Sequence, residues 1–399
     1  MTDAAPAPQP ERQPGWFLAL FALASAGGAV AYVPLLTVLL PQRIAELQGR
    51  EDVTALAQVT FLGAVMASLA NIAVGMMSDR SRTRRPWIAV GLVLSNVLLL
   101  AVGEARSVTA IVVLVMMWQV ALNLMLAPLM AWAGDCFPDA QKGVLGGALA
   151  LSPALGALAG SLVTYAGLVV PEARLALVAV LVSALVLPVL LCGAQRVRPA
   201  LMVPREAIRR TSPLHQSAMA RMWAARLLVQ VAEGGMFAFL LYWLRSIAPG
   251  YPENGAANIF SAVLVCAVPI SLVVGRWSDR RARPVVPLMA AALLCAAGML
   301  VMAAAGTLPL AIAGYVLFAI AAAVFLALHA SQTLRVLPAP QHRGRDLGVF
   351  NLTNTVPGMV MPWLTVLLVP RFGYAGLFVL FAALSLCSAV LLASLGRRV

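Results

Sequence analysis

The stretch Gly75-Met-Met-Ser78-Asp79-Arg80 recurs 200 residues later as Gly275-Arg-Trp-Ser278-Asp279-Arg280. A second pair shares this offset, because Pro138 and Gln141 in the stretch FPDAQKG match Pro338 and Gln341 in LPAPQHRG. Two separate matches at one offset indicate that the chain is a duplicated unit. Each copy of the first motif follows a long apolar run, so the fold depends on what those runs form.

The composition is that of a membrane protein. Of the 399 residues, 62% are hydrophobic and only 11% are charged, and the mean hydropathy is +0.92. Soluble domains are about 45–50% apolar and about 25% charged. This excludes a soluble enzyme, a disordered chain and a secreted disulfide scaffold. The five cysteines show no paired spacing, so we expect them to be reduced and structural.

Twelve apolar runs are long enough to cross a bilayer, which takes about 20 residues per helix. They span residues 15–40, 53–77, 87–103, 108–133, 144–170, 175–193, 219–244, 256–276, 285–304, 308–333, 349–369 and 373–396. The predicted fold is an all-α membrane protein with twelve transmembrane helices in two pseudo-symmetric six-helix bundles. The bundles cover residues 15–193 and 219–399, with a disordered tail at 1–14 and a linker loop at 194–218.

The net charge of +13 lies in short clusters between the apolar runs, which is typical of topology control and not of nucleic-acid binding. With both termini cytoplasmic, twenty basic residues fall in cytoplasmic segments and six in outer loops. This bias predicts that orientation. We expect a multi-pass protein of the plasma membrane, the inner membrane of a bacterium, acting as a monomer.

Twelve spans, a central basic loop and the repeated G-x-x-S-D-R motif resemble the major facilitator superfamily of transporters. Arg84-Arg85-Pro86-Trp87 after the first motif is similar to the glycoside–pentoside–hexuronide symporters and the sucrose-transporter-like carriers, as is the stretch 344–357. Gly147–Gly156 in span five partly resembles the Gly-Pro motif of proton-coupled drug antiporters. These resemblances imply a transporter and not an enzyme, without a cofactor or metal. Its partners would be a small-molecule substrate, protons as the coupling ion, and the lipid bilayer.

The resemblance also implies a latch between the two halves. Asp79 would meet the start of span eleven near Arg345, and Asp279 would meet the start of span five near Lys142, because helix starts carry partial positive charge. Gly75 and Gly275 would supply a compact residue at a tight turn. The candidate gating residues are Gly75, Asp79, Arg80, Arg84, Arg85, Asp135, Gly275, Asp279, Arg280 and Arg335. The alternative is that the arginine clusters only fix the topology. Asp135 and Arg335 could each join the charge network of its own half, or they could be solvated.

Span seven carries a polar stripe of Arg226, Gln230 and Glu233, whose spacings of three, four and seven place them on one helical face. Charges inside a membrane usually face a bundle interior or a wet cavity. Glu233 could carry a proton, or it could hold substrate hydroxyls. A static ion pair with Arg226 is the third possibility.

Further candidates lie on spans one, four and ten. Gln119 and Asn123 share a face and could bind sugar hydroxyls or join helices. Trp118 and Tyr32 could stack on a sugar ring. His329 could relay protons or simply be packed.

The lead hypothesis is a proton-coupled importer of a sugar or glycoside, and the alternative is a proton-coupled exporter of drugs or amphipathic compounds. A receptor built on a carrier fold is a distant third. A sugar importer should surround the stripe with amides and aromatics, whereas an exporter should present a cavity of Met, Phe and Leu. The sequence holds no phosphate-binding GxxxxGK loop and no HExxH or GxSxG motif.

Overall fold

The computed structural model describes residues 12–48, 53–165, 167–193, 196–198, 201, 213–251, 253–337 and 340–396. Among these residues all regular structure is helical, and ten helices are long and apolar enough to span a membrane by themselves. The predicted tail lies outside the described residues up to position 11, and most of the predicted linker does as well.

The N-terminal bundle holds the first six spans, one of which is interrupted. It consists of α1 (Gly15–Pro34), η1 (Leu35–Leu39), α2 (Leu40–Gln48), α3 (Val53–Ser81), α4 (Arg85–Gly103), α5 (Val108–Cys136), η2 (Asp139–Gln141), α6 (Lys142–Leu149), α7 (Leu151–Val163), η3 (Pro171–Ala173) and α8 (Arg174–Cys192).

The C-terminal bundle repeats this order. It consists of α10 (Pro213–Ile247), α11 (Glu253–Arg281), α12 (Val285–Ala303), α13 (Leu308–Val336), η5 (Pro340–His342) and α14 (Arg343–Gly396). The helix α14 contains two spans, because the chain reverses at Gly373, whose φ of 64° only glycine adopts easily. This gives the predicted twelve-helix fold in two bundles.

Two prolines account for irregular spans. Pro41 lacks an N–H and its ring crowds the preceding turn, and the chain widens there into the π-helical η1. Pro153 cannot donate to Leu149, and the fifth span breaks at Ala150 into α6 and α7. That span ends at Val163, seven residues before the predicted end, because the chain turns through Gly167 at a φ of 79°.

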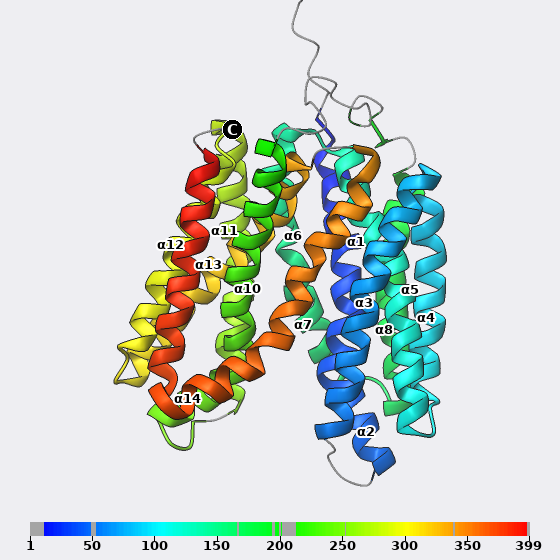
Figure 1. Cartoon of the computed structure of the whole chain (residues 1–399). Helices are drawn as coiled ribbons and strands as arrows, with labels where there is room; N and C mark the ends of the chain where they lie inside the picture. Colours follow the sequence, from blue (N-terminus) through cyan, green and yellow to red (C-terminus); the bar gives the residue numbers. More distant parts are fainter. Residues whose placement is uncertain are drawn as a thin grey trace, which may run out of the picture.

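The two bundles meet at one end and diverge toward the other (Figure 1). At the meeting end α3 contacts α14, while α6 contacts α11 and α13. Both the start of α1 and the end of α14 lie at this end as well. We call it the latch end, because the repeated Ser-Asp-Arg motifs stand there, at the ends of α3 and α11.

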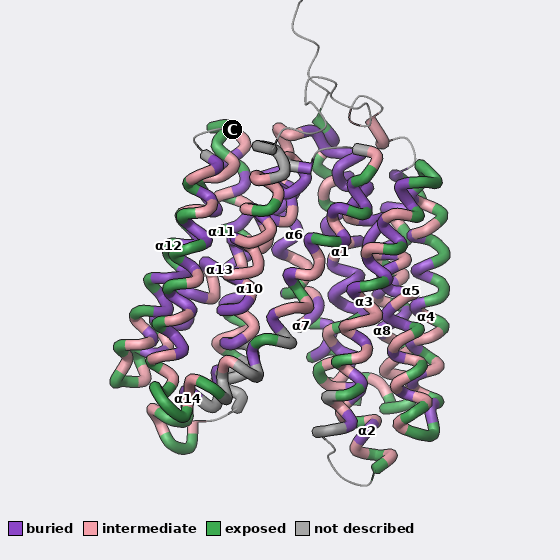
Figure 2. The backbone as a smooth tube through the Cα atoms, viewed as in Figure 1, coloured by how far each residue is buried: buried purple, intermediate pink, exposed green. Residues whose placement is uncertain are grey.

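The outer helix faces are apolar and exposed. Val90, Val93 and Val97 follow one another at helical spacing along α4, and each exposes half or more of its surface. Figure 2 shows buried positions along the inner faces and exposed ones on the outer faces and at the ends. A water-soluble protein rarely shows so continuous an apolar face, so these helices face lipid.

Candidate functional site

The latch end contains two sites, and the first is built around Asp79. Its carboxylate accepts hydrogen bonds from the backbone N–H groups of Gly344 and Arg345, each at 3.0 Å. These groups belong to the first turn of α14, where N–H groups have no partner within the helix. The negative charge of one bundle therefore caps the positive end of a helix in the other.

A buried charge network surrounds this cap. Arg84 lies 2.8 Å from Asp79 and 3.1 Å from Asp135. Asp135 also pairs with Arg343 at 2.8 Å. Arg84 and Asp135 come from the N-terminal bundle and Arg343 from the C-terminal bundle. Asp135 therefore joins a network that crosses between the halves, and not only the network of its own half, as the sequence had suggested.

The second site is built around Asp279. Its carboxylate accepts hydrogen bonds at 2.8 Å from the N–H groups of Gly143 and Val144, in the first turn of α6. Arg335 pairs with Asp279 at 2.9 Å and donates to the Asp139 carbonyl at 2.6 Å. Both caps therefore lie where the resemblance predicted them.

Two further charged residues lie beside these sites. At the second site, Lys142 donates to the Leu334 carbonyl of the opposite bundle at 3.1 Å, near the negative end of α13. Lys142 therefore adds a further link between the halves. At the first site, burial raises the pKa of Asp346, and the hydrogen bonds from Arg345 oppose that rise.

The motif glycines serve the contact between the halves and not the turn. A methyl group at Gly75 would overlap the backbone of Gly344, and one at Gly275 would overlap the backbone of Gly143. The turn itself is made by Arg82 and Ala282, which have φ values of 53° and 49°. The predicted role of the two glycines was therefore wrong, because both lie within helices where the bundles touch.

Three arginines of the predicted gating set do not join the latch. Arg80 and Arg280 are exposed, and the described residues give them no ion pair. Arg85 donates to the Leu190 carbonyl of α8, inside its own bundle. The buried network therefore draws on Arg84, Arg335 and Arg343, of which Arg343 carried no distinguishing pattern in the sequence.

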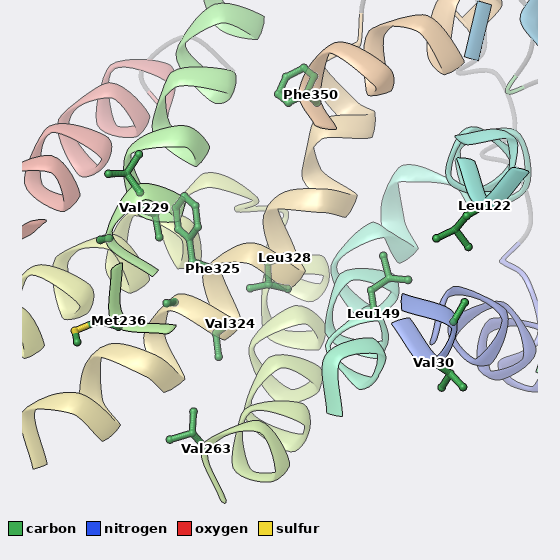
Figure 3. Close-up of a cluster of buried hydrophobic side chains, with 14 of the residues drawn as sticks. Val30, Leu122, Leu149, Val229, Met236, Val263, Val324, Phe325, Leu328 and Phe350 are labelled. Atoms are coloured by element: carbon green, nitrogen blue, oxygen red, sulfur yellow. The ribbon is translucent and has the colours of Figure 1, made fainter. Parts of the chain in front are cut away.

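A cavity of about 290 Å³ lies between the two bundles. Its charged lining residues are Arg226 and Glu233 of α10. Most of the other lining residues are apolar, and Figure 3 shows Leu149, Met236 and Val263 among the buried side chains of this region. A larger hollow of about 880 Å³ among α11, α12 and α13 is lined by aliphatic side chains and prolines of one bundle.

Arg226 is held by neutral groups of three helices. Its Nε donates to Gln230 at 3.1 Å and to Thr353 at 3.0 Å. Its Nη1 donates to the Leu326 carbonyl at 3.3 Å and its Nη2 to Asn354 at 3.2 Å. The sequence left an ion pair between Arg226 and Glu233 as one possibility, but each of these four acceptors is uncharged.

Glu233 lies two helical turns from Arg226, about 10 Å along the axis at 1.5 Å per residue. Gln230 lies within hydrogen-bonding reach of its carboxylate, and Tyr315 of α13 lines the same cavity. Tyr32 of α1 is 39% exposed and is not among the lining residues. Because Ser25 and Leu149 of the opposite bundle line the cavity together with Glu233, the acid faces both halves of the molecule.

The structure does not bring Trp118, Gln119 and Asn123 into the cavity lining. Asn123 accepts a hydrogen bond from Asn71 at 2.7 Å and donates to the Gln119 carbonyl at 2.8 Å, which joins α3 to α5. Trp118 is completely buried within the N-terminal bundle. The helical spacing and the residue types of α5 could not show which of its faces packs inside the N-terminal bundle and which meets the other half.

His329 is also absent from the cavity lining. Its Nε2 lies 3.0 Å from the Met222 carbonyl, and its Nδ1 lies 3.1 Å from the Thr333 hydroxyl. The ring is fully buried beside Phe325 and Phe350. It joins α13 to α10, as the packing alternative proposed.

Comparison with protein families matches only the C-terminal part of the chain. Residues 222–398 match the family model of the Major Facilitator Superfamily. This match covers most of the C-terminal bundle. A search of curated proteins by sequence found no match.

Solved structures extend the likeness to nearly the whole chain. The human organic anion transporter MFSD10 (TETRAN) is 16% identical, with a TM-score of 0.73 over 95% of this chain and 100% of that one. A bacterial homologue of the iron transporter ferroportin, in an outward-facing state, is 16% identical, with a TM-score of 0.76 over 96% and 99%. The E. coli fucose:proton symporter FucP, a superfamily member in the outward conformation, is 16% identical, with a TM-score of 0.69 over 94% and 98%. Nearly the whole chain therefore shares the fold of these solved transporters.

Some residues of the cavity gave no signal in the sequence. Ser25 of α1 and Ser152 of α7 line it, and their hydroxyls lie 3.2 Å apart. Tyr315 of α13 lines it as well. A single hydroxyl in an apolar span is ordinary, so only the placement of the helices distinguishes these three.

Proposed function

We propose that the chain is a secondary active transporter that moves a small amphipathic solute across the plasma membrane by alternating access coupled to protons. The observation that carries the proposal is the cavity between the halves. Its described lining combines one acid and one cation with a wall of Ala, Leu, Met, Phe and Val side chains. Such a wall suits an apolar body, and the charges suit one polar group.

Alternating access follows from the two ends of the molecule. The latch end is closed by capped helices and buried ion pairs, whereas the bundles diverge at the other end. With the latch end cytoplasmic, as the basic loops predict, this is the outward-facing state. Breaking the caps and the pairs would open the cavity to the cytoplasm.

Protons are the proposed coupling ion because Glu233 is the acid in the cavity lining. Arg226 is engaged by neutral acceptors, so the Glu233 carboxylate is free to exchange a proton or a ligand. Sodium ordinarily takes several oxygen ligands, and a single carboxylate supplies few of them. The acid would bind its proton on one side and release it on the other.

Sugar transport is the second candidate, and one observation favours it. The hydroxyls of Ser25, Ser152 and Tyr315 lie in the same lining and could bind sugar hydroxyls. The amides expected of a sugar site, Gln119 and Asn123, are engaged between α3 and α5. No match points to the sucrose-transporter-like branch. The amphipathic solute is therefore the first proposal.

The test uses purified protein in proteoliposomes under an imposed pH gradient. The fluorescent amphipathic dye 1-anilinonaphthalene-8-sulfonate and radiolabelled sucrose are offered in parallel, with protein-free liposomes as the control. We expect the dye to accumulate against its gradient, and a proton ionophore to abolish the accumulation. Uphill movement of sucrose without the dye would favour the sugar reading instead. Movement of neither would contradict the proposed function.

A further inference from the structure

We propose that the solute is a monoanion, such as a carboxylate or a sulfonate on an apolar body, and that it enters the cavity together with one proton. This inference rests on the proposed function and names the charge of its substrate. It follows from the charges of the cavity and from the unused donors of Arg226.

The charge inventory of the cavity is short. Arg226 and Glu233 are the charged residues of its described lining, and no other charge occurs in the sequence of α10 between Arg226 and Arg245. Tyr315 on α13 lines the same cavity, and the other titratable groups close enough to interact electrostatically with the two charges are Tyr32 on α1, Cys295 on α12 and His329 on α13. The ordinary forms of Tyr and Cys at neutral pH are uncharged. His329 has both ring nitrogens engaged by Met222 and Thr333.

Arg226 remains a cation throughout, since a guanidinium keeps its proton in proteins. Its hydrogen bonds to Gln230, Thr353, Asn354 and the Leu326 carbonyl position the group without neutralising it. These bonds use the Nε–H and one N–H on each Nη atom. Each Nη carries a second N–H. The side chain therefore keeps two N–H donors that can bind the oxygens of an anion.

Charge balance then decides which states the cavity favours. Net charge is costly once the cavity closes around its contents and excludes water, so neutral combinations are favoured for the step that crosses the membrane. The empty cavity is neutral when Glu233 is ionised. An anion would make it negative, unless Glu233 takes up a proton at the same time. A cation would leave it positive whether it met the ionised or the protonated acid.

Anion and proton therefore bind with positive coupling. Each raises the affinity for the other by the same factor, as linkage requires. The apolar part of the solute would lie against Met236, Phe260 and Phe318, which belong to the same lining. The transported unit, one anion and one proton, carries no net charge.

The test measures binding and proton uptake together, in purified protein held in nanodiscs. Three probes share one ring system: 1-naphthalenesulfonate, 1-naphthylmethylammonium and 1-naphthylmethanol. Isothermal titration calorimetry in buffers of different ionisation enthalpy gives the number of protons bound with each probe. A sulfonate remains ionised at every pH used, so any proton taken up binds to the protein.

We expect the sulfonate to bind with uptake of about one proton. At pH values where Glu233 of the free protein is ionised, the dissociation constant of the sulfonate should rise about tenfold per pH unit. Glu233→Gln should bind the sulfonate without proton uptake and without this pH dependence. Arg226→Gln should lose the sulfonate and keep the alcohol, which also reports that the variant is folded.

Other outcomes distinguish failure of the monoanion inference from failure of the proposed transport function. Preferred binding of the ammonium, with proton release that depends on Glu233, would overturn the monoanion while a proton-coupled amphipathic transporter stands. Equal binding of all three probes without proton exchange would overturn the inference as well. Failure of the protein to bind any of the three would contradict the proposed function itself.

Discussion

The latch end and the cavity follow the internal repeat very differently. At the latch end, Asp79 and Asp279 stand 200 residues apart and cap equivalent helix starts in opposite bundles. In the cavity, Arg226, Gln230 and Glu233 correspond by the same offset to Ala26, Val30 and Val33. The duplication is therefore visible where the halves must meet each other. It has disappeared in the cavity, where both charged residues and most of the apolar wall come from the C-terminal half, and the N-terminal half contributes two serines among apolar residues.

The latch is itself only half symmetric. Asp135 corresponds to Arg335 and Arg84 to Pro284, so the arginine that pairs with each capping aspartate comes from a different position of the repeat. The first site joins two acids and two arginines and is buried throughout. At the second site Arg335 keeps 17% of its side chain exposed. The first site should therefore depend more strongly on its ion pairs.

Asp135→Asn should give the largest effect on stability, because it leaves Arg84 and Arg343 buried with one carboxylate fewer between them. Breaking a buried pair in this way costs about 3–5 kcal/mol. Thermal unfolding of the purified protein should show a marked drop in the transition temperature. The control is Glu46→Gln, which removes an exposed pair with Arg43 worth less than about 1 kcal/mol. Equal effects of the two substitutions would contradict the buried network.

Gly75→Ala and Gly143→Ala should come next, because each methyl group would meet the backbone of the other bundle. Overpacking of this kind costs about 1–3 kcal/mol, which shifts the equilibrium from the closed latch toward the open one by about 5- to 150-fold. Distances between spin labels at exposed positions 80 and 280, in a cysteine-free background, should lengthen.

The matched control for the glycines is Gly160→Ala. Nothing lies within 4 Å of a methyl group at that position of α7. The distance between the spin labels should therefore stay as in the parent protein. The same lengthening in all three variants would show that helix propensity, and not the contact between bundles, is responsible.

Asn123→Leu should give a smaller effect, confined to stability. It removes the hydrogen bond from Asn71, worth about 1 kcal/mol, and leaves Asn71 unpaired. The KM for the transported solute should stay within about twofold, whereas Ser152→Ala in the cavity lining should change KM and leave thermal unfolding nearly unchanged. A large KM change in Asn123→Leu would return this residue to the substrate path.

Much of the fold was predictable from the sequence, because its signals are local or repeated. Apolar run length gave the twelve spans, and the offset of 200 gave the two bundles. The partners of Asp79 and Asp279 came from family resemblance. The role of Gly75 and Gly275 was missed, since a contact between bundles leaves no trace within either copy.

The candidate site was predictable only on α10. A charged stripe in an apolar span indicates a polar surface whatever the neighbouring helices are. An amide in α5 does not indicate such a surface, because Asn123 can form a hydrogen bond with Asn71 as readily as with a solute. Ser25, Ser152 and Tyr315 come from three helices, and their convergence depends on tertiary packing alone.

The most direct test of the account separates exchange from accumulation in Glu233→Gln. Proteoliposomes loaded with unlabelled solute report exchange, and empty ones under a pH gradient report uphill accumulation. The solute is whichever probe the wild type accumulates. Because a fixed neutral side chain can still bind but cannot carry a proton, exchange should stay within about threefold of wild type while accumulation falls to the equilibrium level. Wild-type accumulation in this variant would contradict the assignment of Glu233 as the coupling acid.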